Sequence, residues 1–162
     1  MNMRHIKHPF PAVVDSKSRI LILGSVPSIK SVENNFYYMH PKNRFWKVLS
    51  AIFGVDLYSA TVDERISFLL ENKIALYDSV EECDIEASKD SAISNVVPAD
   101  IPSLVAKSEI SLIFCNGKAS LYYLLSAYPE YESITTLLPS TSPANAQFSL
   151  EKLIEAWKVI IK

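Results

Sequence analysis

Short apolar runs alternate along the chain with stretches whose apolar residues recur every three or four positions. This alternation is typical of an α/β fold with a mostly parallel sheet. The runs that predict buried strands are 19–23, 74–77, 110–115 and 133–138. Helical spacing is clear in 43–53, which Gly54 would end as a C-cap, and from about Ser149 onward.

The segments between these elements give further local predictions. Thr61-Val62-Asp63-Glu64 has the pattern of a capping box and predicts the start of a second helix. Shorter helices are expected at about 102–108 and from residue 118 to about 127. The stretch 81–100 is polar, and we predict irregular structure there. No repeat or linker interrupts the pattern, so residues 1–162 are predicted to form a single domain.

Polar residues directly follow each predicted strand. They occupy 24–28, 78–79, 116–117 and 140–145. The carboxyl ends of parallel strands meet at one edge of a sheet, where ligands bind in open α/β folds. Together with the loop 35–43, these segments predict one cleft.

Composition narrows the class of protein. The chain has 162 residues, 49% of them hydrophobic, which suits one domain with a full core. Its net charge of −2 weighs against nucleic-acid binding, although a local basic face remains compatible with it. Cys83 and Cys115 are far apart and lack metal-ligand spacing, so we expect two free thiols in a reducing compartment and no metal site. No signal peptide or membrane-spanning run is present, and the protein is expected to be cytoplasmic.

An unusual concentration of aromatic side chains occupies 36–46, with six rings when His40 is counted. Base stacking on such rings is worth about 1–3 kcal/mol per base, but rings can equally fill a core. We favour the core for Phe45 and Trp46 and leave both roles open for Tyr37, Tyr38 and His40. Positive charges stand beside them at Lys42, Arg44 and Lys47.

Asn43 and the two loops at 24–31 and 138–146 also have two interpretations each. By position Asn43 is best explained as a helix cap, although its amide could orient a water or read a base edge. The first loop could bind phosphate through backbone N–H groups, but an ordinary capped turn is favoured. The last loop holds two prolines, three hydroxyls and an amide, which suit either phosphate contacts or a rigid turn bonded to itself. No nucleophilic triad is apparent.

Taken together, these segments resemble the uracil-DNA glycosylase superfamily, in particular its hypoxanthine-DNA glycosylase (DNA-deoxyinosine glycosylase) branch. The matching pieces occur in the family's order: LILGSVPS at 21–28, YYMHPKNRFW at 37–46, LYDSV at 76–80, DSAI at 90–93, FCNGKA at 114–119 and LPSTSPANA at 138–146. The aromatic piece and the last loop are the specific ones, and the resemblance covers nearly the whole chain.

The resemblance implies a three-layer α/β/α sandwich and hydrolysis of the N-glycosidic bond of a deaminated base in double-stranded DNA. Hypoxanthine is the implied base, with uracil as a second substrate, and the implied enzyme is a monomer that needs no metal or cofactor. Asn43 is the implied catalytic amide. The implied base-binding residues are Gly24, Ser25, Val26, Pro27, Tyr37, Tyr38, His40 and Asn116, and the implied DNA-binding residues are Ser28, Lys42, Arg44, Ser140, Thr141, Ser142 and Asn145.

Three departures from the superfamily affect the chemistry. Val26 stands where mismatch-type uracil glycosylases carry an asparagine, which favours the hypoxanthine branch. Ser28 replaces the glycine usual in that branch and would narrow the pocket floor. The last loop begins with Leu138 and Pro139 instead of the histidine of classical uracil glycosylases, so other donors must stabilise the leaving base.

Two other functions stay open at this point. The same cleft could belong to a non-catalytic α/β module that binds a nucleotide or nucleic acid. It could also belong to a small-molecule hydrolase that uses an acid from the 78–90 region, with Asp78, Asp84, Glu86 and Asp90 as its candidates.

Overall fold

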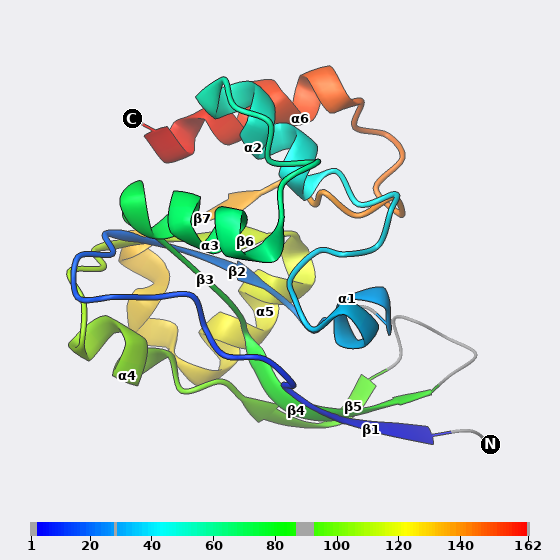
Figure 1. The fold of residues 1–162 in the computed structure, drawn as a ribbon. Coiled ribbons are helices and arrows are strands. Elements are labelled where there is room, and N and C mark those ends of the chain that lie inside the picture. The colour runs from blue at the N-terminus through cyan, green and yellow to red at the C-terminus, as the bar shows by residue number, and fades with distance from the viewer. Residues whose placement is uncertain (1–2, 28, 87–92, 162) are drawn as a thin grey trace.

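The computed structural model describes residues 3–27, 29–86 and 93–161 and has a four-stranded parallel sheet at its centre (Figure 1). The strands lie in the order β3 (Ile74–Asp78), β2 (Ile20–Gly24), β6 (Leu112–Asn116) and β7 (Thr135–Leu138). All four predicted strands are therefore confirmed, and their carboxyl ends meet at one edge.

Alternation along the strands divides the apolar residues between two cores. One face of the sheet packs against α2 (Phe45–Phe53), α3 (Val62–Glu71) and α6 (Leu150–Trp157). The other face packs against α4 (Ile101–Ala106) and α5 (Lys118–Ala127). Because helices cover both faces, as Figure 1 shows, the fold is the three-layer α/β/α sandwich that the resemblance implied.

Local signals in the sequence fix several helix ends. Gly54 ends α2 with a left-handed φ of 70°, and its N–H donates to the Ser50 carbonyl. Thr61 and Glu64 form the capping box of α3, with bonds of 3.1 and 2.9 Å. Ser149 caps α6. The remaining helices are α1 (Ile29–Asn34) and the 3₁₀ helices η1 (Pro129–Ile134) and η2 (Lys158–Ile161).

The prediction of irregular structure in 81–100 is wrong for 81–86 and 93–98, and residues 87–92, with the candidate acid Asp90, lie outside the described residues. Strands β4 (Val80–Glu86) and β5 (Ile93–Pro98) pair antiparallel with each other, and β4 also pairs with β1 (Met3–Lys7). Irregularities in the β4–β5 register break the two-residue period that marks a strand, and the partner β1 is distant in sequence. This small sheet matters for function because it brings the N-terminal segment to the ligand-binding edge of the central sheet.

None of the helices formed by the described residues has the length and apolar character needed to cross a bilayer. Within the same ranges, no three His, Cys, Asp or Glu side chains lie close enough together to hold a metal ion. Cys83 and Cys115 are both buried and free.

Candidate active site

Asn43 lies just before α2 and uses its side-chain oxygen twice. Asn43 Oδ1 accepts a hydrogen bond from the Phe45 N–H at 3.0 Å and another from Thr141 Oγ1 at 2.8 Å. The formal cap position belongs to Arg44, but Asn43 satisfies one of the first free N–H groups of α2. Both lone pairs of the amide oxygen are therefore occupied, and no acceptor in the described chain binds the amide nitrogen. Asn43 can offer a ligand only hydrogen-bond donors.

Thr141 connects Asn43 to the end of β6. The Asn116 amide donates to Thr141 Oγ1 at 3.0 Å, and the Thr141 N–H donates to Asn116 Oδ1 at 3.0 Å. The Thr141 carbonyl accepts from the Arg44 N–H at 3.0 Å. Thr141 is fully buried. The expectation that Thr141 grips DNA is therefore replaced by a different role, in which it holds the catalytic candidate and Asn116 in place.

Tyr38 reaches the carboxyl ends of the strands. Its φ of 55° is rare for a residue with a side chain, and its ring stacks on Phe45 at 4.1 Å between centroids. Its hydroxyl is buried and makes no hydrogen bond of normal geometry within the described chain, although the Asn116 amide approaches it. Burial raises the pKa of Tyr38, so the phenol keeps its proton and remains a donor.

Gly24 allows this hydroxyl to approach the backbone closely. A Cβ atom built on Gly24 would lie 2.4 Å from Asp78 Oδ1 and 2.8 Å from Tyr38 Oη. Those two oxygens therefore pack directly against Gly24, an approach that only glycine permits. Ser25, Val26 and Pro27 continue from Gly24 as the predicted first loop, and the Ser25 carbonyl accepts from the Val80 N–H at 3.1 Å. Ser28 lies outside the described residues.

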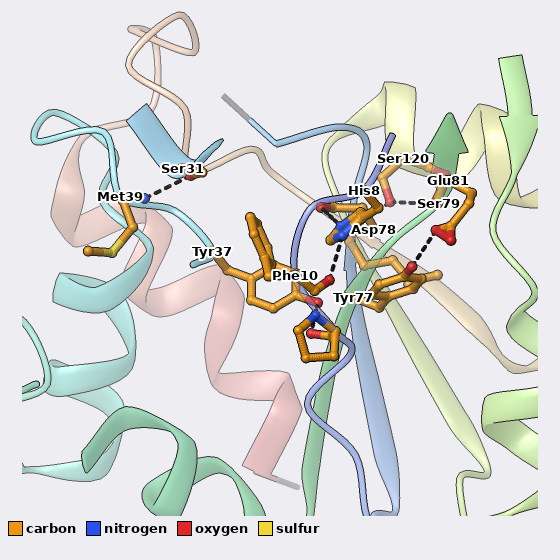
Figure 2. Close-up of polar contacts among 12 residues, drawn as sticks. His8, Phe10, Ser31, Tyr37, Met39, Tyr77, Asp78, Ser79, Glu81 and Ser120 are labelled. Carbon is orange, nitrogen blue, oxygen red and sulfur yellow. Dashed lines mark hydrogen bonds and ion pairs between the residues drawn. The ribbon is translucent and has the colours of Figure 1, made fainter. Parts of the chain in front are cut away.

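Tyr37 belongs to the hydrophobic core. Its ring is 2% exposed and packs in the core against Phe10 and Phe36. Its hydroxyl donates to the Pro11 carbonyl at 2.8 Å, and burial raises its pKa (Figure 2). The expectation that Tyr37 stacks on a base is therefore corrected, because both faces of its ring are covered by protein.

His40 borders a neighbouring cavity of about 250 Å³ that also touches Tyr38 and Asn43. His40 Nδ1 accepts from the Lys42 N–H at 3.1 Å, so any ring proton on neutral His40 is on Nε2. Arg65 lies on the far wall, buried, with its guanidinium 4.6 Å from the centroid of the Trp46 ring. Its donors go to the Leu57 and Tyr58 carbonyls and to the Met39 sulfur.

The last loop is rigid and bonded to itself. Arg44 donates to the carbonyls of Phe148, Ser142 and Asn145, the last two at 2.9 and 3.0 Å. Asn145 Nδ2 donates to the Ser140 carbonyl at 3.0 Å, and Ser140 Oγ accepts from the Ser142 N–H at 3.1 Å. Arg44 therefore holds the loop and is not an exposed phosphate ligand, which corrects its expected role. Lys42 is exposed.

A pair that the predicted site residues did not include lies at the end of β3. His8 Nε2 is 2.7 Å from Asp78 Oδ2, and the two side chains are 0% and 4% exposed (Figure 2). The sequence held a weak indication that Asp78 belongs to the site, because Asp78 directly follows a strand. It held no such indication for His8, because the position of His8 depends on the pairing of β1 with β4, which the sequence pattern did not reveal.

The assembled edge thus brings a buried phenol and a buried carboxyl group together at Gly24, and Thr141 links a donor-only amide to the end of β6. The matching family model is that of the uracil DNA glycosylase superfamily, and the match covers residues 11–160. The chain belongs to the uracil DNA glycosylase superfamily. Its relatives in this superfamily match almost end to end.

Two relatives carry the name hypoxanthine DNA glycosylase. The one from Methanosarcina acetivorans is 36% identical over 159 residues, which is 97% of this chain and 99% of the relative. The one from Methanosarcina barkeri is also 36% identical over 159 residues, with coverage of 96% and 98%. A solution NMR structure from Methanosarcina acetivorans, described as a candidate uracil DNA glycosylase, superimposes with a TM-score of 0.77 at 30% identity and covers 94% of this chain and 97% of its own.

Proposed function

We propose that this protein hydrolyses the N-glycosidic bond of hypoxanthine in double-stranded DNA, with uracil as a second substrate. The superfamily and the names of the two relatives support a glycosylase of deaminated bases. The products are the free base and an abasic site. This hydrolysis is the first step of base excision repair. A mispaired deaminated base leaves the stack at a cost of a few kcal/mol, which the enzyme must offset by binding it.

The state of Asn43 carries the mechanistic part of the proposal. Cleavage puts positive charge on the sugar and negative charge on the departing base. A fixed N–H donor aimed at that negative charge lowers the barrier, and removal of one such donor typically costs about 10²–10³ in rate. Because Thr141 and the Phe45 N–H occupy its oxygen, Asn43 presents its amide protons to the leaving base. The alternative, in which the Asn43 oxygen accepts a proton from the attacking water, has no free lone pair available.

Tyr38 and Asp78 offer a means of distinguishing hypoxanthine from adenine. The Tyr38 hydroxyl is a donor and Asp78 Oδ1 is an acceptor, and both lie against Gly24. Deamination of adenine replaces the acceptor N1 and the amino group by an N1–H donor and the acceptor O6. The donor–acceptor pair of the protein therefore complements hypoxanthine and opposes adenine, and it complements the N3–H and O4 of uracil in the same way.

The exposed surface around the site supplies the contacts to DNA. We place the exposed Lys42 beside a phosphate and the polar loop 140–145 against the backbone near the flipped nucleotide. Local charge of this kind can act on a chain whose net charge is −2.

The test is an excision assay on a labelled duplex that contains a single deoxyinosine. Alkali-sensitive breaks and free hypoxanthine are expected with the wild-type protein and not with Asn43→Ala. Binding without breaks would identify a non-catalytic nucleic-acid-binding module instead. Folded protein that neither binds nor cleaves the duplex would overturn the proposed function.

A further inference from the structure

His8 binds Asp78 through Oδ2, while Asp78 Oδ1 lies against Gly24. Its ring centroid lies 4.7 Å from that of Phe10, 5.8 Å from that of Tyr37 and 4.4 Å from that of Tyr77 (Figure 2). Its backbone N–H donates to the Glu81 carbonyl at 2.8 Å. The imidazole is thus enclosed by the N-terminal segment, Tyr37, β3 and β4, and the His8 side chain is fully buried.

The two contacts of the ring determine where its protons lie. His8 Nδ1 is 2.8 Å from the Phe10 carbonyl oxygen, which can only accept, so Nδ1 carries a proton. The 2.7 Å contact between His8 Nε2 and Asp78 Oδ2 then needs one proton more. That proton resides either on Nε2, as in an imidazolium–carboxylate pair, or on Oδ2, as in a neutral pair. In both cases it lies between Nε2 and Oδ2, and Asp78 Oδ1 stays unprotonated.

We propose that His8 is the positioning residue that keeps Asp78 Oδ1 a fixed hydrogen-bond acceptor for the lactam N–H of the flipped base. The proposal rests on the proposed function and adds to it the residue that sets base preference. A buried carboxyl group without this partner could turn or place a proton on Oδ1, and Oδ1 would then donate to N1 of adenine. With His8 in place, adenine meets an acceptor opposite its own acceptor.

The depth of the pair separates this role from that of a general base. Asp78 is 3% exposed and lies against Gly24 and Tyr38. The attacking water must reach the sugar, which stays attached to the DNA outside the protein core. A carboxyl group buried this deeply is better placed to contact the flipped base than to activate that water, and the fully buried side chain of His8 is placed to hold the carboxyl group.

The test uses two nearly isosteric substitutions, His8→Gln and His8→Met. The Gln amide can still donate to Asp78 Oδ2, whereas the Met thioether cannot. Each protein is titrated with two duplexes that carry an uncleavable 2′-fluoro nucleotide, one with hypoxanthine and one with unsubstituted purine. Purine lacks both O6 and the N1 proton, so the ratio of the two dissociation constants reports the contribution of the lactam edge.

We expect the wild-type protein to prefer hypoxanthine by at least about tenfold, His8→Gln to keep most of this ratio, and His8→Met to lose it. A role in folding alone would lower the melting temperature of both variants and leave the ratio unchanged in each, which would overturn the proposal. A wild-type ratio near one would also overturn it. The matched control is His5→Met, since His5 contacts Asp84 at 2.7 Å on the same strand pair but lies outside the site.

Failure of this proposal is distinguishable from failure of the proposed function because the duplexes are not cleaved. If the wild-type protein releases no hypoxanthine from ordinary deoxyinosine DNA but binds with the expected ratios, the catalytic proposal fails and the role of His8 stands. If it releases hypoxanthine and His8→Met keeps the full ratio, the catalytic proposal stands and the role of His8 fails. Should His8→Met not fold, His8→Leu, which also lacks a donor, takes its place with the same expected loss of the ratio and the same overturning result.

Discussion

Thr141 donates its hydroxyl proton to Asn43 at 2.8 Å, and this bond determines what Asn43 can do. The Thr141 hydroxyl in turn accepts from the Asn116 amide. The order of donors along this path leaves the Asn43 amide nitrogen free and its oxygen occupied. A residue that sequence position alone explains as a helix cap is therefore also a fixed donor at the edge of the sheet.

Asn43→Asp separates the donor role from an acceptor role. The carboxylate can still accept from the Phe45 N–H and from Thr141, so the helix start should be kept. It cannot donate to the leaving base and repels its negative charge. We expect single-turnover excision of hypoxanthine to fall by about 10²–10³ or more while the melting temperature changes little. Activity equal to or above that of the wild-type protein would instead assign Asn43 to water activation.

Thr141→Val removes the hydroxyl while keeping the shape of the side chain. Asn43 and Asn116 each lose a buried partner, which costs about 1–3 kcal/mol of unfolding free energy for an unsatisfied group. Excision should slow as well, because Asn43 is no longer held. Urea denaturation and single-turnover kinetics measure the two effects. Thr141→Ser, which keeps the hydroxyl, is the control and should retain most of both.

Gly24→Ala and Gly54→Ala form a matched pair. At Gly24 the added methyl group meets Asp78 Oδ1 and Tyr38 Oη at 2.4 and 2.8 Å, so it displaces the two groups proposed to contact the base edge. At Gly54 it meets nothing within 4 Å, but the left-handed φ of 70° costs about 1–2 kcal/mol. We expect Gly54→Ala to lower stability and keep excision, and Gly24→Ala to abolish excision. Equal activity in both variants would contradict the placement of the base at Gly24.

His5 gives a pH-dependent contribution to stability that is independent of the site. Hydrogen bonds first to Asp84 and then to Glu82 raise the pKa of His5 above its usual 6.5. Because the pKa is raised, the stabilisation is fully present below the pKa that His5 has in the unfolded chain. It is lost as the pH rises through the pKa of His5 in the folded protein. His5→Gln should therefore lower the melting temperature more at about pH 5.5 than at about pH 9. An equal loss at both values would show that the charge of His5 does not contribute.

The sequence predicted the central sheet well because β2, β3 and β6 are largely buried on both faces and form continuous apolar runs. The specific motifs that contain Asn43 and the last loop marked them as site candidates, and their roles stay predictions. The sequence pattern missed β1, β4 and β5, whose side chains are mixed and whose pairing is long-range, and so it missed His8. It also assigned Tyr37, Arg44 and Thr141 to ligand contacts, since composition does not show whether a polar or aromatic group in a loop faces outward or bonds to a neighbouring segment.

Lys42→Ala tests the contact to the DNA backbone. Lys42 is exposed beside Asn43, and we propose that it neutralises one phosphate. Its loss should weaken binding to any duplex by a similar factor, with or without a deaminated base, and reduce the slope of log Kd against log salt by about 1. The rate of excision at saturating protein should stay near that of the wild type, because the charge acts on binding. Lys152→Ala on α6 is the control for a surface charge outside the site. A Lys42→Ala variant with an unchanged salt slope would show that the DNA backbone passes elsewhere on the surface.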